Sequence, residues 1–230
     1  MGHYCYICPK GFLRPTITTW HSWLTLFISY NCRFELTAAA LKKLAESFNS
    51  YKSQVNLAGL IELCEREGKT VVYEKEEYLL HQGEIERHIS LVKSGYCRYT
   101  CLKSDGGEAV VGLAMAGEFV TDFNNGVRRI PALASQVASV RTEVLQLPFG
   151  YALERLCQSN PNFLYTASDA LFRMCYTRLL ELYVLSPTER YRKFAESYPD
   201  IVSRIKVKEL ASYLQISHQH LLRIKKIAGE

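Results

Sequence analysis

The sequence predicts an α+β protein in which an antiparallel β-sandwich or barrel is flanked by helices. Between Thr70 and Pro148, short apolar runs alternate with turn residues about every 8–12 residues, the spacing of an all-β sandwich or barrel. Before and after this stretch the apolar residues recur at helical spacing. The 230 residues are 48% hydrophobic and 22% charged, as in ordinary globular proteins. No run reaches the roughly 18 apolar residues of a membrane-spanning helix, so we expect no membrane partner. The cysteines are scattered and three of them lie in apolar helical patterns, which indicates free thiols in a reduced, cytoplasmic protein.

Two helices are expected before the strands. Ala38–Phe48 places Leu41, Leu44 and Phe48 on one face, and Leu57–Arg66 ends before Gly68. Residues 1–35 contain no acidic residue before Glu35 and fit no signal peptide, so we expect them to be an appended N-terminal extension. Residues 36–158 are then expected to form the β domain with its N-terminal helices.

The strands are predicted from apolar runs that end at glycine or charged turns. The expected runs are Val71–Tyr73, Tyr78–Leu80, Ile89–Val92, Cys97–Leu102, Val110–Ala114, Val137–Val140 and Val144–Leu147. The turns between them include Gln82–Glu84, Ser94-Gly95, Asp105–Gly107 and Ala116–Glu118.

A long helix is predicted after the strands, with Asn160 as its cap and Pro161 at its first position, running to Leu185. Apolar residues lie around most of the circumference of this helix, so it needs two packing partners or burial within a single domain. We expect residues 159–185 to form a dimerisation helix. The contact residues expected there are Leu164, Leu171, Met174, Cys175 and Leu182.

The last segment, residues 186–230, is predicted to be a small helical domain. Ser186–Glu189 has the pattern of a capping box that starts a helix ending near Ser197. Two short helices follow, Val207–Leu214 and His218–Ile227, joined by a turn at Gln215-Ile216. The small Ala211 at their crossing indicates a helix-turn-helix. Ile201–Glu230 also carries six basic and two acidic residues, four of the five excess positive charges of the chain.

These features predict that the second short helix reads double-stranded DNA. His218, Gln219, Leu222, Arg223 and Lys226 share its outer face, and Gln and Arg side chains make bidentate contacts with base edges. Lys206, Lys208 and Lys225 are expected to contact phosphates, as is the helix start capped by Ser217. His218 and His220 lie two positions apart and so cannot share a metal ion within one protomer.

The motifs Gln82–Glu84, Val92–Gly95 and Gly117–Phe119 are followed by the long helix and by Leu210–Lys226. On these features the sequence resembles the Crp/Fnr family of bacterial transcription regulators over about Leu36–Ala228. The resemblance implies a jelly-roll sensor domain, a homodimer and a two-fold operator. It also implies RNA polymerase and a small-molecule effector as further partners. Ser217 falls on the family's phosphate-contacting position, and His218, Gln219 and Arg223 fall on its base-reading positions.

Three departures from the family pattern change these expectations. An effector pocket is expected around Gly117, Glu118, Thr121 and Asp122, but Ala132–Gln136 carries no arginine to clamp a cyclic phosphate. We therefore do not expect cyclic AMP, and a different ligand or no ligand remains open. No cofactor is expected. Gln215 replaces the usual glycine of the turn. The C-terminal β-hairpin wing of many relatives is expected to be absent, which predicts weaker and more salt-sensitive DNA binding.

Two other classes of function remain as alternatives. A redox or iron–sulfur regulator would use Cys5, Cys8 and Cys32 with Cys97 or Cys101, but the spacing of these cysteines is irregular and we expect no metal site. An enzyme is not expected, because no hydrolase or nucleotide-binding motif is present and His81 and His88 are isolated. The three acidic residues Glu74, Glu76 and Glu77 are interpreted as a solvated turn.

Overall fold

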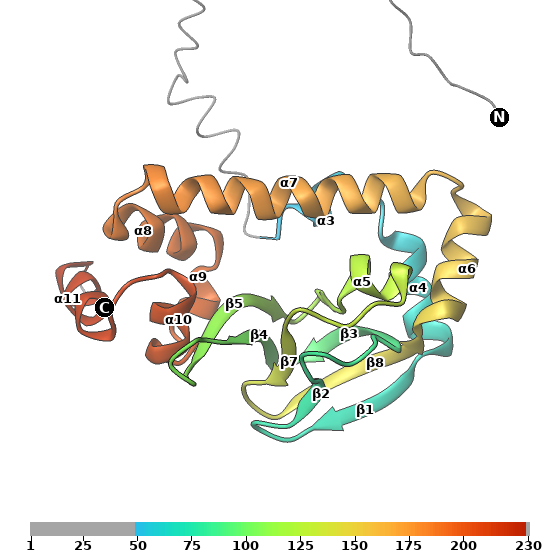
Figure 1. Cartoon of the computed structure of the whole chain (residues 1–230), viewed down its shortest axis with the longest axis horizontal. Helices are drawn as coiled ribbons and strands as arrows, with labels where there is room; N and C mark the ends of the chain where they lie inside the picture. Colours follow the sequence, from blue (N-terminus) through green and yellow to red (C-terminus); the bar gives the residue numbers. More distant parts are fainter. Residues whose placement is uncertain (1–48, 229–230) are drawn as a thin grey trace, which may run out of the picture. The chain divides into compact units, whose positions relative to one another are not determined.

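Two four-stranded antiparallel sheets form the central domain of the computed structural model, which describes residues 49–228 (Figure 1). In spatial order, the first sheet contains β1 (Lys69–Tyr73), β8 (Thr142–Pro148), β3 (His88–Ser94) and β6 (Phe119–Val120). The second contains β2 (Tyr78–Leu80), β7 (Ser135–Ala138), β4 (Tyr96–Leu102) and β5 (Glu108–Met115). The pairs β1–β8, β2–β7, β3–β6 and β4–β5 give the strand order of a jelly roll, so the predicted sandwich is confirmed.

The turn between β3 and β4 shows why glycine stands at one of the predicted turns. Gly95 has φ of +79°, a left-handed conformation that disfavours other residues. A Cβ atom there would lie 2.6 Å from both the carbonyl oxygen of Arg141 and Oγ1 of Thr142. Gly95 therefore lets this turn approach the start of β8.

One short helix, α5 (Phe123–Arg128), interrupts the β domain and was not predicted. Asn124-Asn125-Gly126 resembles a turn in sequence, but Asp122 caps the segment by accepting a hydrogen bond from the Asn125 amide. Arg128 is the last residue of this helix, and Arg129 is its left-handed C-cap at φ 53°.

The helices beside the sandwich were predicted only in part. After α3 (Tyr51–Gln54), α4 (Ala58–Glu67) matches the expected helix at Leu57–Arg66. The expected helix at Ala38–Phe48, the extension 1–35 and its cysteines lie outside the described residues.

The predicted long helix is present, but it begins at Phe163 with Asn162 as its cap, so the cap predicted at Asn160 was wrong. An additional helix, α6 (Phe149–Ser159), directly follows β8, and α7 (Phe163–Val184) starts three residues after Asn160. Asn160 instead closes the turn between the two helices, because its Oδ1 accepts the Asn162 amide at 3.1 Å.

The C-terminal helices follow the predicted pattern closely. The capping box at Ser186 has both its hydrogen bonds and starts α8 (Pro187–Ser197), as predicted. Then come α9 (Pro199–Val202), α10 (Val207–Tyr213) and α11 (His218–Ala228). No helix among residues 49–228 is long and apolar enough to cross a membrane.

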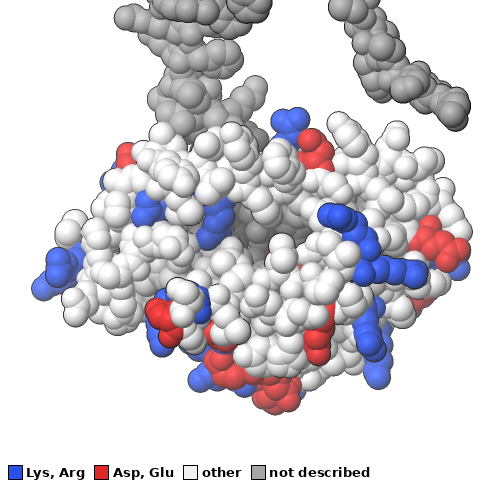
Figure 2. Space-filling view, viewed as in Figure 1, with Lys and Arg blue, Asp and Glu red and all other residues white. Residues whose placement is uncertain are grey.

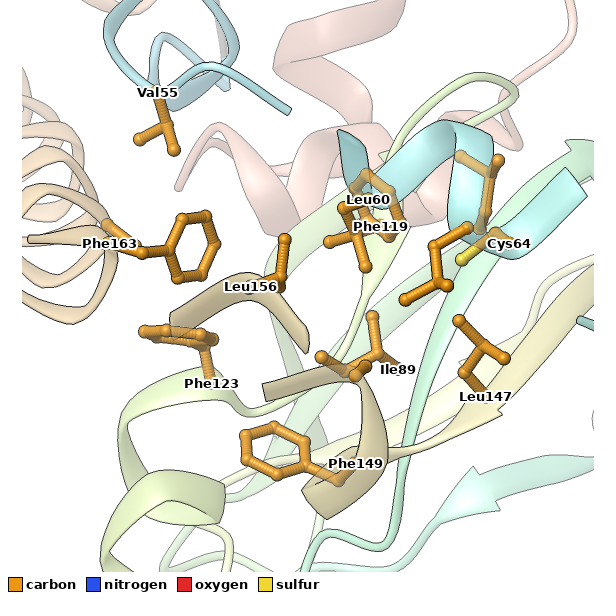
Figure 3. Packing of buried hydrophobic residues seen from close by; sticks show 14 of the residues in the cluster. Val55, Leu60, Cys64, Ile89, Phe119, Phe123, Leu147, Phe149, Leu156 and Phe163 are labelled. Atoms are coloured by element: carbon orange, nitrogen blue, oxygen red, sulfur yellow. The ribbon is translucent and has the colours of Figure 1, made fainter. Parts of the chain in front are cut away.

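Two large core clusters hold these elements together. The first packs Ile89 and Leu147 of the sheet against Leu60 of α4, Leu156 of α6 and Phe163 of α7 (Figure 3). The second packs β4 and β5 against the C-terminal helices and includes Tyr96, Phe194, Leu210 and Leu221. The described part of the chain therefore has one continuous fold from α3 to α11.

Candidate functional site

The two C-terminal helices meet through small and apolar side chains. The turn between them is closed by backbone hydrogen bonds, from the Gln215 amide to the Ser212 carbonyl (3.1 Å) and from the Ile216 amide to the Ala211 carbonyl (3.0 Å). Ser217 caps α11, because its Oγ accepts the His220 amide at 3.2 Å. The predicted inward residues Leu210, Ala211, Leu214, Leu221 and Ile224 are all buried, and Glu209 and Tyr213 are buried with them.

The turn residue Gln215 has a left-handed backbone, with φ of 55°. This conformation costs a residue with a Cβ atom about 1 kcal/mol or more. We therefore expect Gln215→Gly to be more stable than Gln215→Ala by about 1 kcal/mol in urea unfolding. Gln215→Ala is the control, because both variants lose the side-chain bond from Nε2 to the Ser212 carbonyl. Equal stability of the two variants would contradict a strained turn.

The outer face of α11 carries the side chains that the sequence assigned to base reading. His218, Gln219, Leu222, Arg223 and Lys226 are all exposed. Figure 2 shows basic side chains at the end of the molecule that carries α11. The face is therefore accessible, polar and positively charged, on a helix whose opposite side is fixed in the core.

The three lysines expected to contact phosphates differ in their surroundings. Lys208 is exposed, and Lys225 is half-buried. Lys206 instead forms ion pairs with Glu76 and Glu209, each at 3.0 Å. Burial alone would lower the pKa of Lys206, but these two hydrogen bonds outweigh it and raise the pKa. Lys206 therefore connects α10 to the β domain rather than pointing freely to a ligand.

A buried polar cluster joins α10 to the strands, and the sequence did not reveal it. Arg98 of β4 lies 3.6 Å from Glu209, contacts Glu76 and donates to Ser139 Oγ at 3.3 Å. Tyr96 donates to Glu209 at 2.9 Å. Glu76 is thus part of an ion-pair network, which corrects the interpretation of Glu74–Glu77 as only a solvated turn. The available signal was Arg98 itself, a charged residue within an apolar strand.

Two arginines fix the turn between α10 and α11. Arg190 of α8 donates to the carbonyls of Leu214 (2.9 Å) and Gln215 (3.2 Å). Arg178 of α7 lies 3.2 Å from the centroid of the Tyr213 ring and donates to the Tyr213 carbonyl at 2.7 Å. The orientation of α11 is therefore set by α7 and α8 as well as by the β domain.

A cavity of about 330 Å³ lies between the β domain and α7. Its walls come from α3 and α4, strands β3, β4 and β5, the segment Phe119–Asn125, the loop residues Leu133 and Ala134, and α7. Tyr51, Tyr99, Phe119, Phe123 and Phe163 supply aromatic surface. The volume is within the range of small-molecule sites.

Of the four residues expected at an effector pocket, only two lie at the cavity. Thr121 and Asp122 line the cavity, whereas Gly117 and Glu118 do not. Glu118 is buried and turns away, accepting hydrogen bonds from the Met115 amide (2.9 Å), Tyr198 (3.3 Å) and Asn49. Burial raises the pKa of Glu118, although the Met115 amide and the Lys52 cation oppose the shift. Glu118 therefore ties the turn before β6 to α8 and α9 through Tyr198.

The large apolar side chains exposed on α7 include none of the five predicted contact residues, of which only Cys175 is exposed. Leu164 and Leu171 pack against the core of their own protomer, and Met174 and Cys175 line the cavity. Leu182 is half-buried. The large exposed side chains are Tyr165, Phe172, Tyr176, Leu179, Leu180, Tyr183 and Val184. We call these seven residues the α7 apolar face.

The cysteines of the described segment do not form a metal site. All five are free thiols, and no group of three potential ligands within residues 49–228 is placed to hold a metal ion. Burial raises the pKa of Cys97 to about 12 and also raises that of Cys101. Both thiols are therefore poor thiolate donors.

Comparison with known proteins agrees with this architecture. Residues 70–160 match the cyclic nucleotide-binding domain. The barrel has the fold of that domain. Among solved structures, FixK2 from Bradyrhizobium japonicum is similar with a TM-score of 0.58 and 17% identity, covering 70% of this chain and 84% of that chain.

The c-di-GMP-responsive global regulator CLP of Xanthomonas campestris is similar with a TM-score of 0.54 and 19% identity, covering 75% of this chain and 91% of that chain. No curated protein sequence is significantly similar to this one. The predicted resemblance to Crp/Fnr-type regulators thus extends to the fold, in which a cyclic nucleotide-binding domain is followed by C-terminal helices.

Proposed function

We propose that the chain is a DNA-binding transcription regulator of the Crp/Fnr type that binds a two-fold operator as a homodimer. The observation that supports this best is the outer face of α11. His218, Gln219 and Arg223 are exposed on a capped helix whose buried side is held by α10. Such a helix inserts into the major groove, where these side-chain types contact base edges.

The α7 apolar face supports the homodimer. Phe172, Tyr176, Leu179 and Tyr183 follow one another at spacings of four, three and four residues, as in helices that pair along their length. A stripe of this kind is stabilised when it is covered by another helix. A second copy of α7 would cover it, and the two α11 helices would then read two half-sites.

The proposal also excludes cyclic AMP as the effector. The described residues that line the cavity include no lysine or arginine, and the segment Ala132–Gln136, where the resemblance implies the phosphate clamp, contributes only Leu133 and Ala134 to them. A buried phosphate without a cationic partner is strongly disfavoured.

The first test is selection of bound duplexes from a random library with the full chain. We expect an enriched sequence with two-fold symmetry and half-sites about 10 base pairs apart, and an affinity that falls steeply with salt. No enrichment and no salt-dependent duplex binding would overturn the proposed function.

Arg223→Ala is expected to weaken binding to the enriched duplex by about 1–3 kcal/mol, or roughly 5- to 150-fold, because one base contact is lost. Fluorescence anisotropy of labelled duplex measures the effect. Arg87→Ala is the control, since Arg87 is an exposed arginine on the β domain. Equal effects of the two substitutions would show that only overall charge matters.

A further inference from the structure

We infer that the cavity beneath α7 binds an uncharged, predominantly apolar small molecule of the size of two or three aromatic rings. The location is that of an effector site in the proposed function, but the chemistry of the walls differs from that of a nucleotide site. Binding itself does not depend on the proposed function, whereas any effect of the ligand on DNA binding does.

The first argument concerns charge. Asp122 is the one charged side chain among the described lining residues. Its carboxylate faces the protein, accepting the Asn125 Nδ2 group at 2.9 Å and the amides of Asn125 and Leu133, each at 3.4 Å. An anionic ligand would therefore enter a site whose described residues supply one carboxylate and no cation, and a cationic ligand would meet a carboxylate already occupied by protein donors.

The second argument concerns hydrogen bonds. The polar side chains of the wall have partners within the protein. Thr121 Oγ1 donates to the His88 carbonyl (3.2 Å), Asn124 Oδ1 accepts from Ser168 (3.0 Å), and the hydroxyl of Tyr99 accepts the Thr121 amide (3.1 Å). Tyr51 accepts the Phe119 amide at 3.3 Å. Polar groups that already have protein partners leave fewer free donors and acceptors for a polar ligand, so we expect apolar contact to dominate binding.

The third argument concerns shape. The five aromatic side chains of the wall are joined by aliphatic ones from α4, β5 and α7, including Leu60, Leu113 and Leu171. A cavity of about 330 Å³ with such walls suits a compact ring system rather than a long chain. Gly112 contributes to this shape, because a Cβ atom there would lie 2.9 Å from the Tyr99 ring.

The position of the cavity gives a ligand a route to the rest of the molecule. Ala167, Leu171, Met174 and Cys175 of α7 line it, and Phe172 and Tyr176 of the α7 apolar face lie on the same turns of that helix. A ligand that fixes this part of α7 therefore acts on the helix that we propose to dimerise.

The test uses two fluorescent probes that differ by one sulfonate group. N-phenyl-1-naphthylamine is neutral, and 8-anilino-1-naphthalenesulfonate carries a negative charge on the same ring system. We expect saturable binding of the neutral probe to the full chain, at least tenfold weaker binding of the sulfonate, and no displacement of the neutral probe by cyclic AMP. Failure of the neutral probe to bind, tighter binding of the sulfonate, or displacement by cyclic AMP would each overturn the inference.

Two matched pairs of variants locate the binding. Val111→Phe fills the cavity from β5 and should weaken binding of the neutral probe at least tenfold. Val72→Phe is its control, because Val72 is 39% exposed, close to the 43% of Val111, but does not line the cavity. It should leave probe binding unchanged. Leu133→Arg places a cation at the cavity and should strengthen binding of the sulfonate probe. Leu102→Arg, with similar exposure outside the lining residues, should not.

Equal behaviour within either pair would show adsorption to the surface and overturn the inference. Because no DNA is present, probe binding by a protein that fails duplex selection would leave the cavity assignment intact and remove only the proposed function.

Discussion

Arg98→Met is expected to lower the free energy of unfolding by about 3 kcal/mol, the largest stability effect that we predict for a single side chain. Arg98 is 7% exposed and lies between Glu76, Glu209 and Ser139. Removing one partner of a buried ion pair typically costs about 3–5 kcal/mol, because the other charge remains buried. We expect the lower end of this range, since Lys206 also reaches Glu209 at 3.0 Å.

Urea unfolding followed by circular dichroism measures this loss. Arg141→Met is the matched control, because Arg141 pairs with Glu74 at 3.3 Å with both side chains 65% exposed. An exposed pair contributes about 0–1 kcal/mol. If Arg98→Met shifted the unfolding midpoint no more than Arg141→Met, the cluster would not hold α10 to the strands.

The strand pattern was predictable because each apolar run ends at a residue with a local reason to turn. Gly95 illustrates this, since its positive φ and close approach to β8 both require glycine. The helix α5 was not predictable in the same way. Its stability depends on Asp122, which caps it and also accepts the amide of Leu133, a residue eleven positions further along the chain.

The effector residues show how adjacent positions separate in space. Thr121 and Asp122 reach the cavity, but Glu118 points to Tyr198, 80 positions away. Lys206 is a similar case, because its partner Glu76 lies 130 positions earlier in the chain. Charge and spacing identified these residues as special, but not the side chains that they meet.

Sequence periodicity does not predict which face of α7 packs against the β domain. A helix with apolar residues around most of its circumference has several possible inner faces. Only the position of the β domain decides that Leu164 and Leu171 face inward and that Phe172 and Tyr183 face outward. The sequence could therefore predict that α7 needs two partners, but not which residues meet each one.

Phe172→Glu is accordingly expected to convert a dimer into a monomer. Phe172 is 64% exposed, and its ring stacks on that of Tyr176 with centroids 5.8 Å apart. A second copy of α7 would bury both rings, and a carboxylate in that apolar contact would be desolvated without a partner. Sedimentation analysis should show half the mass of the dimer formed by the original chain. At concentrations low enough for both proteins to be monomeric, the unfolding midpoint of the variant should differ little from that of the original chain.

The same substitution should weaken binding to the two-fold duplex by about 100-fold or more, because a monomer engages one half-site and loses the gain in effective concentration from the second. Leu102→Glu is the control, since Leu102 is 69% exposed on β4 and outside the α7 apolar face. A Phe172→Glu protein that sediments as a dimer would assign dimerisation to another surface. A monomer that still binds the full duplex as tightly as the original protein would show that dimerisation through α7 is not needed for DNA binding.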